Sequence, residues 1–183
     1  MCLFKMNRSV TDIENEIVNL ILIAETCFLV CKIIPVNERG NDFLPFFYNL
    51  NFSKGVMCLH NLLLSKKRNE ITITNYTAQK GLKSIGSSGA GLNKRFVSLI
   101  TRMDLAFPIS LRNKVIAHND SHFTHADFAC AYLTDMATLD KYLEITRDLK
   151  DVFCEVANYD KTVSYDRILF QAKQAIETVL KSN

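Results

Sequence analysis

The stretch "IENEIVNLILIAETCFLVCKIIP", residues 13–35, decides the fold class. Its apolar residues recur at steps of four and three, which is the spacing of one face of an α-helix. That stripe consists of Ile13, Ile17, Leu20, Ala24, Cys27 and Cys31. Pro35 has no backbone N–H to continue the helix and is expected to end it. The sequence therefore predicts a long helix that is buried along one side.

Its most hydrophobic part, residues 17–34, approaches the length of a membrane-spanning helix, but Asn19, Glu25 and Lys32 interrupt it. A charge at the centre of a bilayer is costly. Three acidic side chains also lie in residues 12–16, where a signal peptide would carry basic ones. We expect a cytoplasmic protein with no membrane contact.

Helical spacing continues downstream, and it predicts a pair of antiparallel helices at the start of the chain. The second helix would be capped by Asp42, with Pro45 in its first turn. Its expected apolar face is Phe43, Phe46, Phe47, Leu50, Met57 and Leu64.

Further helices are predicted over residues 96–107, 109–118, 124–156 and 164–179, with Pro108 either kinking or separating two of them. Ser164 would cap the last one, and its expected buried stripe is Ile168, Ala172, Ala175, Ile176 and Val179. The fold class predicted for residues 1–183 is a single all-α domain, a four- to five-helix up-and-down bundle.

The segment "KKRNEITITNYTAQKGLKSIGSSGAG", residues 66–91, lacks a sustained helical period and contains charges, turn residues and glycines. We expect a long, flexible, basic connection within the domain. A phosphate-binding loop at "GSSGAG" is the alternative, but no Lys-Ser/Thr follows the glycines, as that loop requires.

The positive charge of the chain is concentrated in one region. Residues 66–118 contain ten basic and two acidic side chains, net +8, although the whole chain carries only +3. Such a concentration is typical of a surface that faces a polyanion, and the alternative is a solvated basic loop.

The six cysteines show no CxxC spacing and mostly lie in apolar runs. This pattern argues against a zinc ribbon or a disulfide framework and favours reduced thiols.

The stretch "SLRNKVIAHND", residues 110–120, places Arg112 and His118 six residues apart. "RNKVIAH" resembles the Arg-x(4–6)-His signature of the HEPN superfamily, the higher-eukaryote and prokaryote nucleotide-binding helical bundles. The "AHND" continuation and the expected helices around it are most similar to abortive-infection-type members.

The resemblance implies a four- or five-helix bundle that forms a homodimer, with Arg112 and His118 of both copies lining one cleft. It also implies a metal-independent endoribonuclease that acts in phage defence or as a toxin, with an antitoxin or defence-system partner. No metal and no cofactor are expected.

Arg112 and His118 also suit RNA cleavage on chemical grounds. His118 titrates near neutrality and can transfer the proton of an attacking ribose 2′-hydroxyl. Arg112 offers a permanently charged planar fork for two phosphate oxygens. The reaction would leave a 2′,3′-cyclic phosphate.

The spacing constrains how the two residues meet, because six helical residues place Arg112 and His118 roughly 120° apart around a straight helix. Either the helix ends before His118, or a second copy of the chain completes the site. Lys114 shares the face of His118 and could add charge.

Neighbouring residues have expected supporting roles, each beside a plainer alternative. Asn113 could orient the site or be a surface residue, and Asp120 could hold the imidazole or cap a helix. Lys94, Arg95 and Arg102 are the cations expected to contact RNA.

Two other interpretations remain. His118, His122 and His125 fall at i, i+4 and i+7 and could bind zinc on a continuous helix, but the "NDS" between the first two is a turn signal. Alternatively, the bundle is a non-catalytic module that binds RNA or a partner, with Arg112 and His118 in structural roles.

Overall fold

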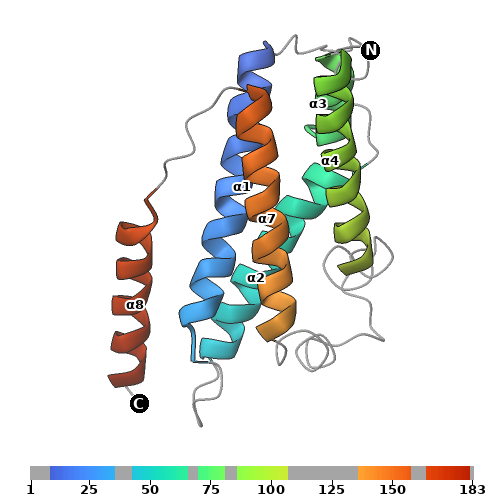
Figure 1. Cartoon of the computed structure of the whole chain (residues 1–183). Helices are drawn as coiled ribbons and strands as arrows, with labels where there is room; N and C mark the ends of the chain where they lie inside the picture. Colours follow the sequence, from blue (N-terminus) through green and yellow to red (C-terminus); the bar gives the residue numbers. More distant parts are fainter. Residues whose placement is uncertain are drawn as a thin grey trace, which may run out of the picture.

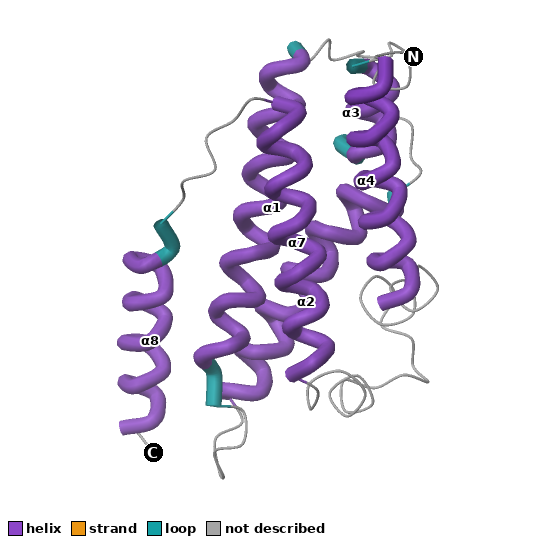
Figure 2. Tube along the Cα trace, viewed as in Figure 1, coloured by secondary structure: helices purple, strands orange, loops and turns teal. Residues whose placement is uncertain are grey.

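The computed structural model describes residues 9–35, 43–65, 70–80, 86–106, 136–157 and 164–181. These ranges contain six helices and no strand, which confirms the all-α class (Figure 2). The helices are α1 (Val10–Ile33), α2 (Phe43–Leu64), α3 (Ile73–Gln79), α4 (Gly86–Ala106), α7 (Met136–Ala157) and α8 (Asp166–Lys181).

Helices α1, α2, α4 and α7 form a closed four-helix arrangement. α1 packs against α2 and α7, and α4 packs against the same two helices from the other side (Figure 1). Successive members run in opposite directions, so this part of the chain is an up-and-down bundle. The short α3 packs on α2, and α8 lies along the outer side of α1.

The first helix matches its prediction. Ile17, Ala24 and Cys31 are buried in the core, and the helix ends before Pro35. A capping box begins it: the Ser9 hydroxyl accepts a hydrogen bond from the Asp12 backbone N–H, and the Asp12 carboxylate accepts one from the Ser9 N–H, both at 3.1 Å. These two bonds satisfy amides that would otherwise lack partners in the first turn.

The predicted buried face of the second helix is wrong in its first half. Phe43, Phe46 and Leu50 are 49%, 62% and 57% exposed. Of the other predicted residues, Leu64 is buried and Phe47 packs against the core. The remaining apolar side chains that α2 buries are Leu44, Tyr48, Phe52, Val56, Cys58, Leu59, Leu62 and Leu63. Apolar residues surround this helix almost completely, so the period alone does not choose the side that meets α1 and α4.

The prediction of a connection without helices over residues 66–91 is also wrong where the structure describes it. α3 occupies residues 73–79, capped by Thr72, whose side chain accepts from the Asn75 N–H at 3.0 Å. α4 already begins at Gly86, within "GSSGAG". Tertiary packing of Ile73 and Tyr76, both 1% exposed, outweighs the weak helix propensity of this Thr- and Asn-rich stretch.

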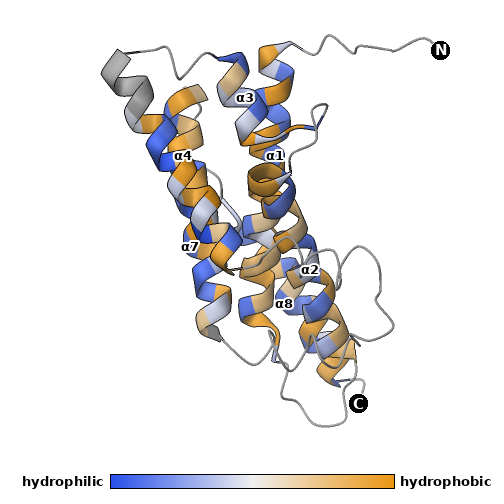
Figure 3. Ribbon diagram, turned by 90° about the vertical axis from the view of Figure 1, so that its right-hand side faces the viewer, coloured by the Kyte–Doolittle hydropathy of each residue, from blue (hydrophilic) through white to orange (hydrophobic). Residues whose placement is uncertain are grey.

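Helices α4 and α7 follow the predicted amphipathic pattern. Phe96 and Met103 of α4 are buried, and so are Leu139, Leu143 and Phe153 of α7. Hydrophilic residues alternate with hydrophobic ones along α4 (Figure 3). Each of these helices buries its apolar stripe and exposes its polar face to solvent. Charged side chains of α4 and α7 can therefore meet at the surface, along the line where the two helices pack.

In α8 three of the five residues predicted to be buried do face the core, but Leu169 takes the place of Ile168. Ile176 is buried and Leu169, Ala172 and Val179 pack on the core, but Ile168 is 46% exposed. Ala175 is exposed as well. The helix begins at Asp166, and the Tyr165 carbonyl accepts its first backbone hydrogen bond, so the N-cap residue is Tyr165 and not the predicted Ser164. The Ser164 hydroxyl still accepts a hydrogen bond from the Asp166 N–H.

The described helices include none that is long and apolar enough to cross a membrane.

Gly55 of α2 lies directly against the ring of Phe28 of α1. A Cβ at this position would be 2.7 Å from Phe28 Cε1. The Phe28 ring is stacked on Tyr142 at 5.6 Å and meets Phe52 edge-on at 6.1 Å, so it has little room to move. We expect Gly55→Ala to lower the free energy of unfolding by about 1–3 kcal/mol through overpacking.

Gly91→Ala is the matched control, because no heavy atom lies within 4 Å of a Cβ at that position in α4. This variant is expected to gain up to about 1 kcal/mol from the better helix propensity of alanine. Denaturation in urea measures both, and a Gly55→Ala protein as stable as Gly91→Ala would contradict the close packing of α1 on α2.

Candidate functional site

The motif residues fall outside the described part of the chain. Arg112, Asn113, Lys114, His118 and Asp120 all belong to residues 107–135, as do Pro108, His122 and His125. Their roles in RNA cleavage and in the zinc alternative therefore stay predictions. The structure does describe the two helix ends between which this segment runs.

Those two helix ends are the C-terminus of α4 and the N-terminus of α7, and they lie at the same end of the bundle (Figure 1). The Tyr142 hydroxyl of α7 donates a hydrogen bond to the Ala106 carbonyl oxygen at 3.2 Å. Tyr142 is fully buried, and its ring packs on Phe28 and Phe52. The last residue of α4 is thus held by a buried side chain of α7.

The three cations expected to bind RNA all belong to α4, and two of them are already paired with carboxylates of α7. Arg95 Nη1 lies 2.6 Å from Glu155 Oε2. Lys94, one residue earlier, is exposed.

Arg102 is held more completely than Arg95. Its Nη1 lies 2.5 Å from Asp148 Oδ2 and its Nη2 lies 3.0 Å from Glu144 Oε1. Both terminal amino groups of the guanidinium therefore have a carboxylate partner. Arg95 and Arg102 are seven residues apart, so they share one face of α4, and that face is turned toward α7.

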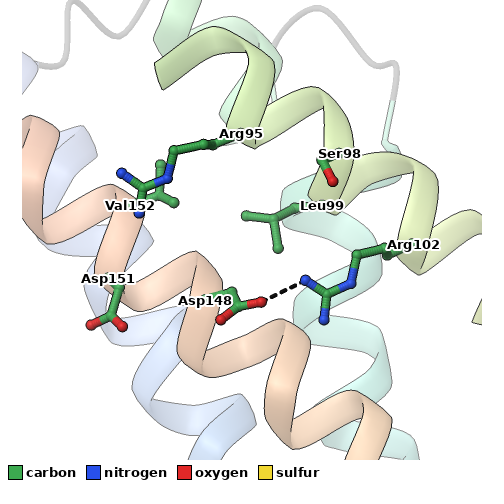
Figure 4. A pocket seen from close by; sticks show the side chains of 7 residues that line it. All are labelled: Arg95, Ser98, Leu99, Arg102, Asp148, Asp151 and Val152. Carbon is green, nitrogen blue, oxygen red and sulfur yellow. Dashed lines mark hydrogen bonds and ion pairs between the residues drawn. The ribbon is translucent and has the colours of Figure 1, made fainter. Parts of the chain in front are cut away.

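A pocket of about 280 Å³ lies between the two arginines (Figure 4). Arg95, Ser98, Leu99 and Arg102 line it from α4, and Asp148, Asp151 and Val152 line it from α7. Exposed ion pairs of this kind each contribute only about 0.2–1 kcal/mol to stability. The arginines are accordingly held by weak interactions that another anion can replace.

The acidic partners in α7 were missed in the sequence, although their spacing was visible there. Glu144, Asp148, Asp151 and Glu155 follow one another at steps of four, three and four, the spacing of one helix face. We call these four residues, together with Arg95 and Arg102, the α4–α7 seam. Its four carboxylates and two guanidinium groups give it a net formal charge of −2.

The burial of a second charged group, Glu25, was not predicted from the sequence. Glu25 interrupts the apolar stretch of α1 and is only 3% exposed. Its Oε2 lies 2.6 Å from Lys150 Nζ of α7 and accepts a hydrogen bond of 2.6 Å from the Tyr165 hydroxyl. Arg147 Nε is 3.6 Å from its Oε1. Burial and the hydrogen bond to Glu25 raise the pKa of Tyr165. One carboxylate thus joins α1, α7 and the start of α8.

The described cysteines are buried, free thiols, as the sequence predicts. Burial, with a contribution from neighbouring Cys58, raises the pKa of Cys27 to about 11. Burial also raises the pKa of Cys31 and Cys58. A thiol must ionise to act as a nucleophile, so these three are unreactive near neutral pH.

Among the described residues, no group of three or more His, Cys, Asp or Glu side chains is arranged to hold a metal ion. His60 is buried in α2.

Comparisons of this chain with protein-family models, with curated proteins and with solved structures found no match. The similarity to the HEPN superfamily therefore rests on the motif in residues 112–118 and on its placement among helices.

Proposed function

We propose that this protein is a metal-independent endoribonuclease of the HEPN type that acts in phage defence or in a toxin–antitoxin system. One observation carries the proposal: the segment with Arg112 and His118 connects α4 and α7 of an all-helical bundle, and Tyr142 of α7 donates a hydrogen bond to Ala106, the last residue of α4. This contact holds the two helices together where the segment leaves α4, and a catalytic pair needs well-ordered supporting elements, because small displacements of catalytic groups cost much of the rate.

The cleavage step requires only the ribose, a proton carrier and a cation. The 2′-oxygen attacks the adjacent phosphorus, the bond from phosphorus to the 5′-oxygen breaks, and a 2′,3′-cyclic phosphate and a 5′-hydroxyl result. His118 transfers the proton, and Arg112 binds the phosphate oxygens. Lys114 adds positive charge, while Asn113 and Asp120 orient the reacting groups.

The catalytic cleft is proposed to be composite. On a straight helix Arg112 and His118 would be about 120° apart, and a second copy of the chain related by a two-fold axis would then complete each site. The described ends of α4 and α7, between which the motif occurs in the sequence, lie at one end of the bundle, and two bundles that meet there would share one cleft.

The decisive experiment is cleavage of a fluorescently labelled RNA in the presence of a chelator. We expect cleavage to proceed at an unchanged rate in EDTA, because neither proposed catalytic group needs a metal. The products should carry 2′,3′-cyclic phosphate ends, which mass spectrometry identifies. Cleavage that EDTA abolishes and zinc restores would instead support the cluster of His118, His122 and His125.

A non-catalytic module that binds RNA or a partner is the second candidate. The pairing of Arg95 and Arg102 with α7 favours its partner-binding form, since cations paired within the bundle are less available to RNA. RNA binding without any cleavage, or capture of a partner without RNA binding, would support this candidate.

A further inference from the structure

Arg102, the described arginine nearest in sequence to the motif, has both of its terminal amino groups bound to carboxylates. Arg102 lies four residues before Ala106, about 6 Å along the helix axis from the end of α4. Its Nη1 and Nη2 contact Asp148 and Glu144 at 2.5 and 3.0 Å. A guanidinium binds phosphate through these same amino groups, so it cannot hold both carboxylates and an RNA phosphate in this way.

The surroundings of Arg102 also oppose RNA. The α4–α7 seam carries a net formal charge of −2, and a polyanion is repelled by an excess of carboxylates. Within this seam the carboxylates therefore outnumber the two arginines. This excess arises from tertiary packing, because the acidic residues come from a part of the chain that is distant in sequence.

The pairs of Arg102 are nevertheless replaceable. The side chains of Asp148 and Glu144 are 46% and 67% exposed, so water and ions reach them from outside. Figure 4 shows the Arg102 guanidinium meeting Asp148 beside the pocket, on whose floor Leu99 lies between the two arginines. An anion that approaches this pocket can exchange with a carboxylate without disturbing the core.

We propose that Glu144 and Asp148 compete with RNA for Arg102 and thereby hold down the affinity of this face of α4 for RNA. The inference rests on the proposed function and adds an internal control of its RNA-binding surface. RNA binds here by exchange: a phosphate takes the amino groups of Arg102, and the two carboxylates turn to solvent. Anything that neutralises these carboxylates then strengthens RNA binding.

A double-mutant cycle tests the proposal with a non-cleavable probe, a fluorescein-labelled 2′-O-methyl RNA of mixed sequence. Binding is measured by anisotropy with the full-length chain over a series of salt concentrations. Glu144→Gln/Asp148→Asn should bind roughly three- to tenfold more tightly than the wild type, and its salt slope should steepen by about 0.7, the contribution of one phosphate contact in a single strand. Glu144→Gln alone, at a well-exposed position, should give a smaller gain in the same direction.

Arg102→Gln provides the control that separates competition from a general change of charge. In this background the two neutralising substitutions should improve binding less than twofold, because the cation that they release is absent. A gain that persists without Arg102, or no gain in either the double or the single variant, would overturn the proposal. If neither the wild type nor any variant binds the probe, the proposed RNA-directed function fails as well.

Discussion

Replacing His118 by alanine is expected to slow RNA cleavage by about 10²–10⁴-fold while leaving the fold intact. The loss corresponds to the usual contribution of a general acid–base group. Single-turnover cleavage of a labelled RNA measures the rate, and circular dichroism with thermal melting checks the fold. Arg112→Ala should also slow RNA cleavage with the fold intact, since it removes the charge that stabilises the reacting phosphate.

His122→Ala is the matched control for the loss of an imidazole, and it should retain cleavage. A His118→Ala protein that cleaves RNA at the wild-type rate would rule out the proposed mechanism. If His118→Ala and His122→Ala lose activity equally and the wild type contains zinc, the zinc alternative is favoured. Mixing inactive His118→Ala with inactive Arg112→Ala chains would restore part of the activity if each cleft uses both copies.

Replacing Glu25 by alanine is expected to lower the free energy of unfolding by about 3 kcal/mol, the largest effect on stability that we predict. The substitution leaves the ammonium group of Lys150 largely buried without its carboxylate, and breaking a buried pair from one side typically costs about 3–5 kcal/mol. The thermal midpoint should fall by about 6–12 °C for a domain of this size.

Glu155→Ala is the matched control, because it removes a carboxylate from an exposed pair with Arg95 and should cost less than about 1 kcal/mol. The double variant Glu25→Leu/Lys150→Met should recover part of the loss, since it removes both charges together. Equal costs for Glu25→Ala and Glu155→Ala would show that the burial of Glu25 does not matter for stability.

Much of the fold was predictable because the decisive patterns are local. The stripe of α1, its end at Pro35 and the buried sides of α4 and α7 all follow from amphipathic spacing. The side of α2 was not predictable, since apolar residues such as Phe46 and Phe52 lie about 120° apart around the helix and only the neighbouring helices decide which is covered. α3 was missed because its helix depends on burying Ile73 and Tyr76.

The candidate catalytic residues come from a local sequence signal, and the charged contacts around α4 and α7 do not. The spacing of Arg112 and His118 is a local signal, whereas the pairing of Arg102 with Glu144 and Asp148 joins residues more than forty positions apart. The acidic periodicity of α7 was visible, but nothing local showed that it would meet the arginines of α4. Glu25 was noted only as an interruption of an apolar run, and its partner Lys150 is 125 positions away.

The contacts of α1 also bear on the order in which the chain folds. α1 and α2 are close in sequence and can form a hairpin as soon as residue 64 is reached, whereas α7 and its Lys150 come much later. In an early hairpin, Glu25 can remain hydrated, and its burial awaits the arrival of Lys150. We expect Glu25 to disfavour packing of α1 on incorrect segments of the chain. A segment without a cation at this position would bury the carboxylate without an ion-pair partner, which costs free energy.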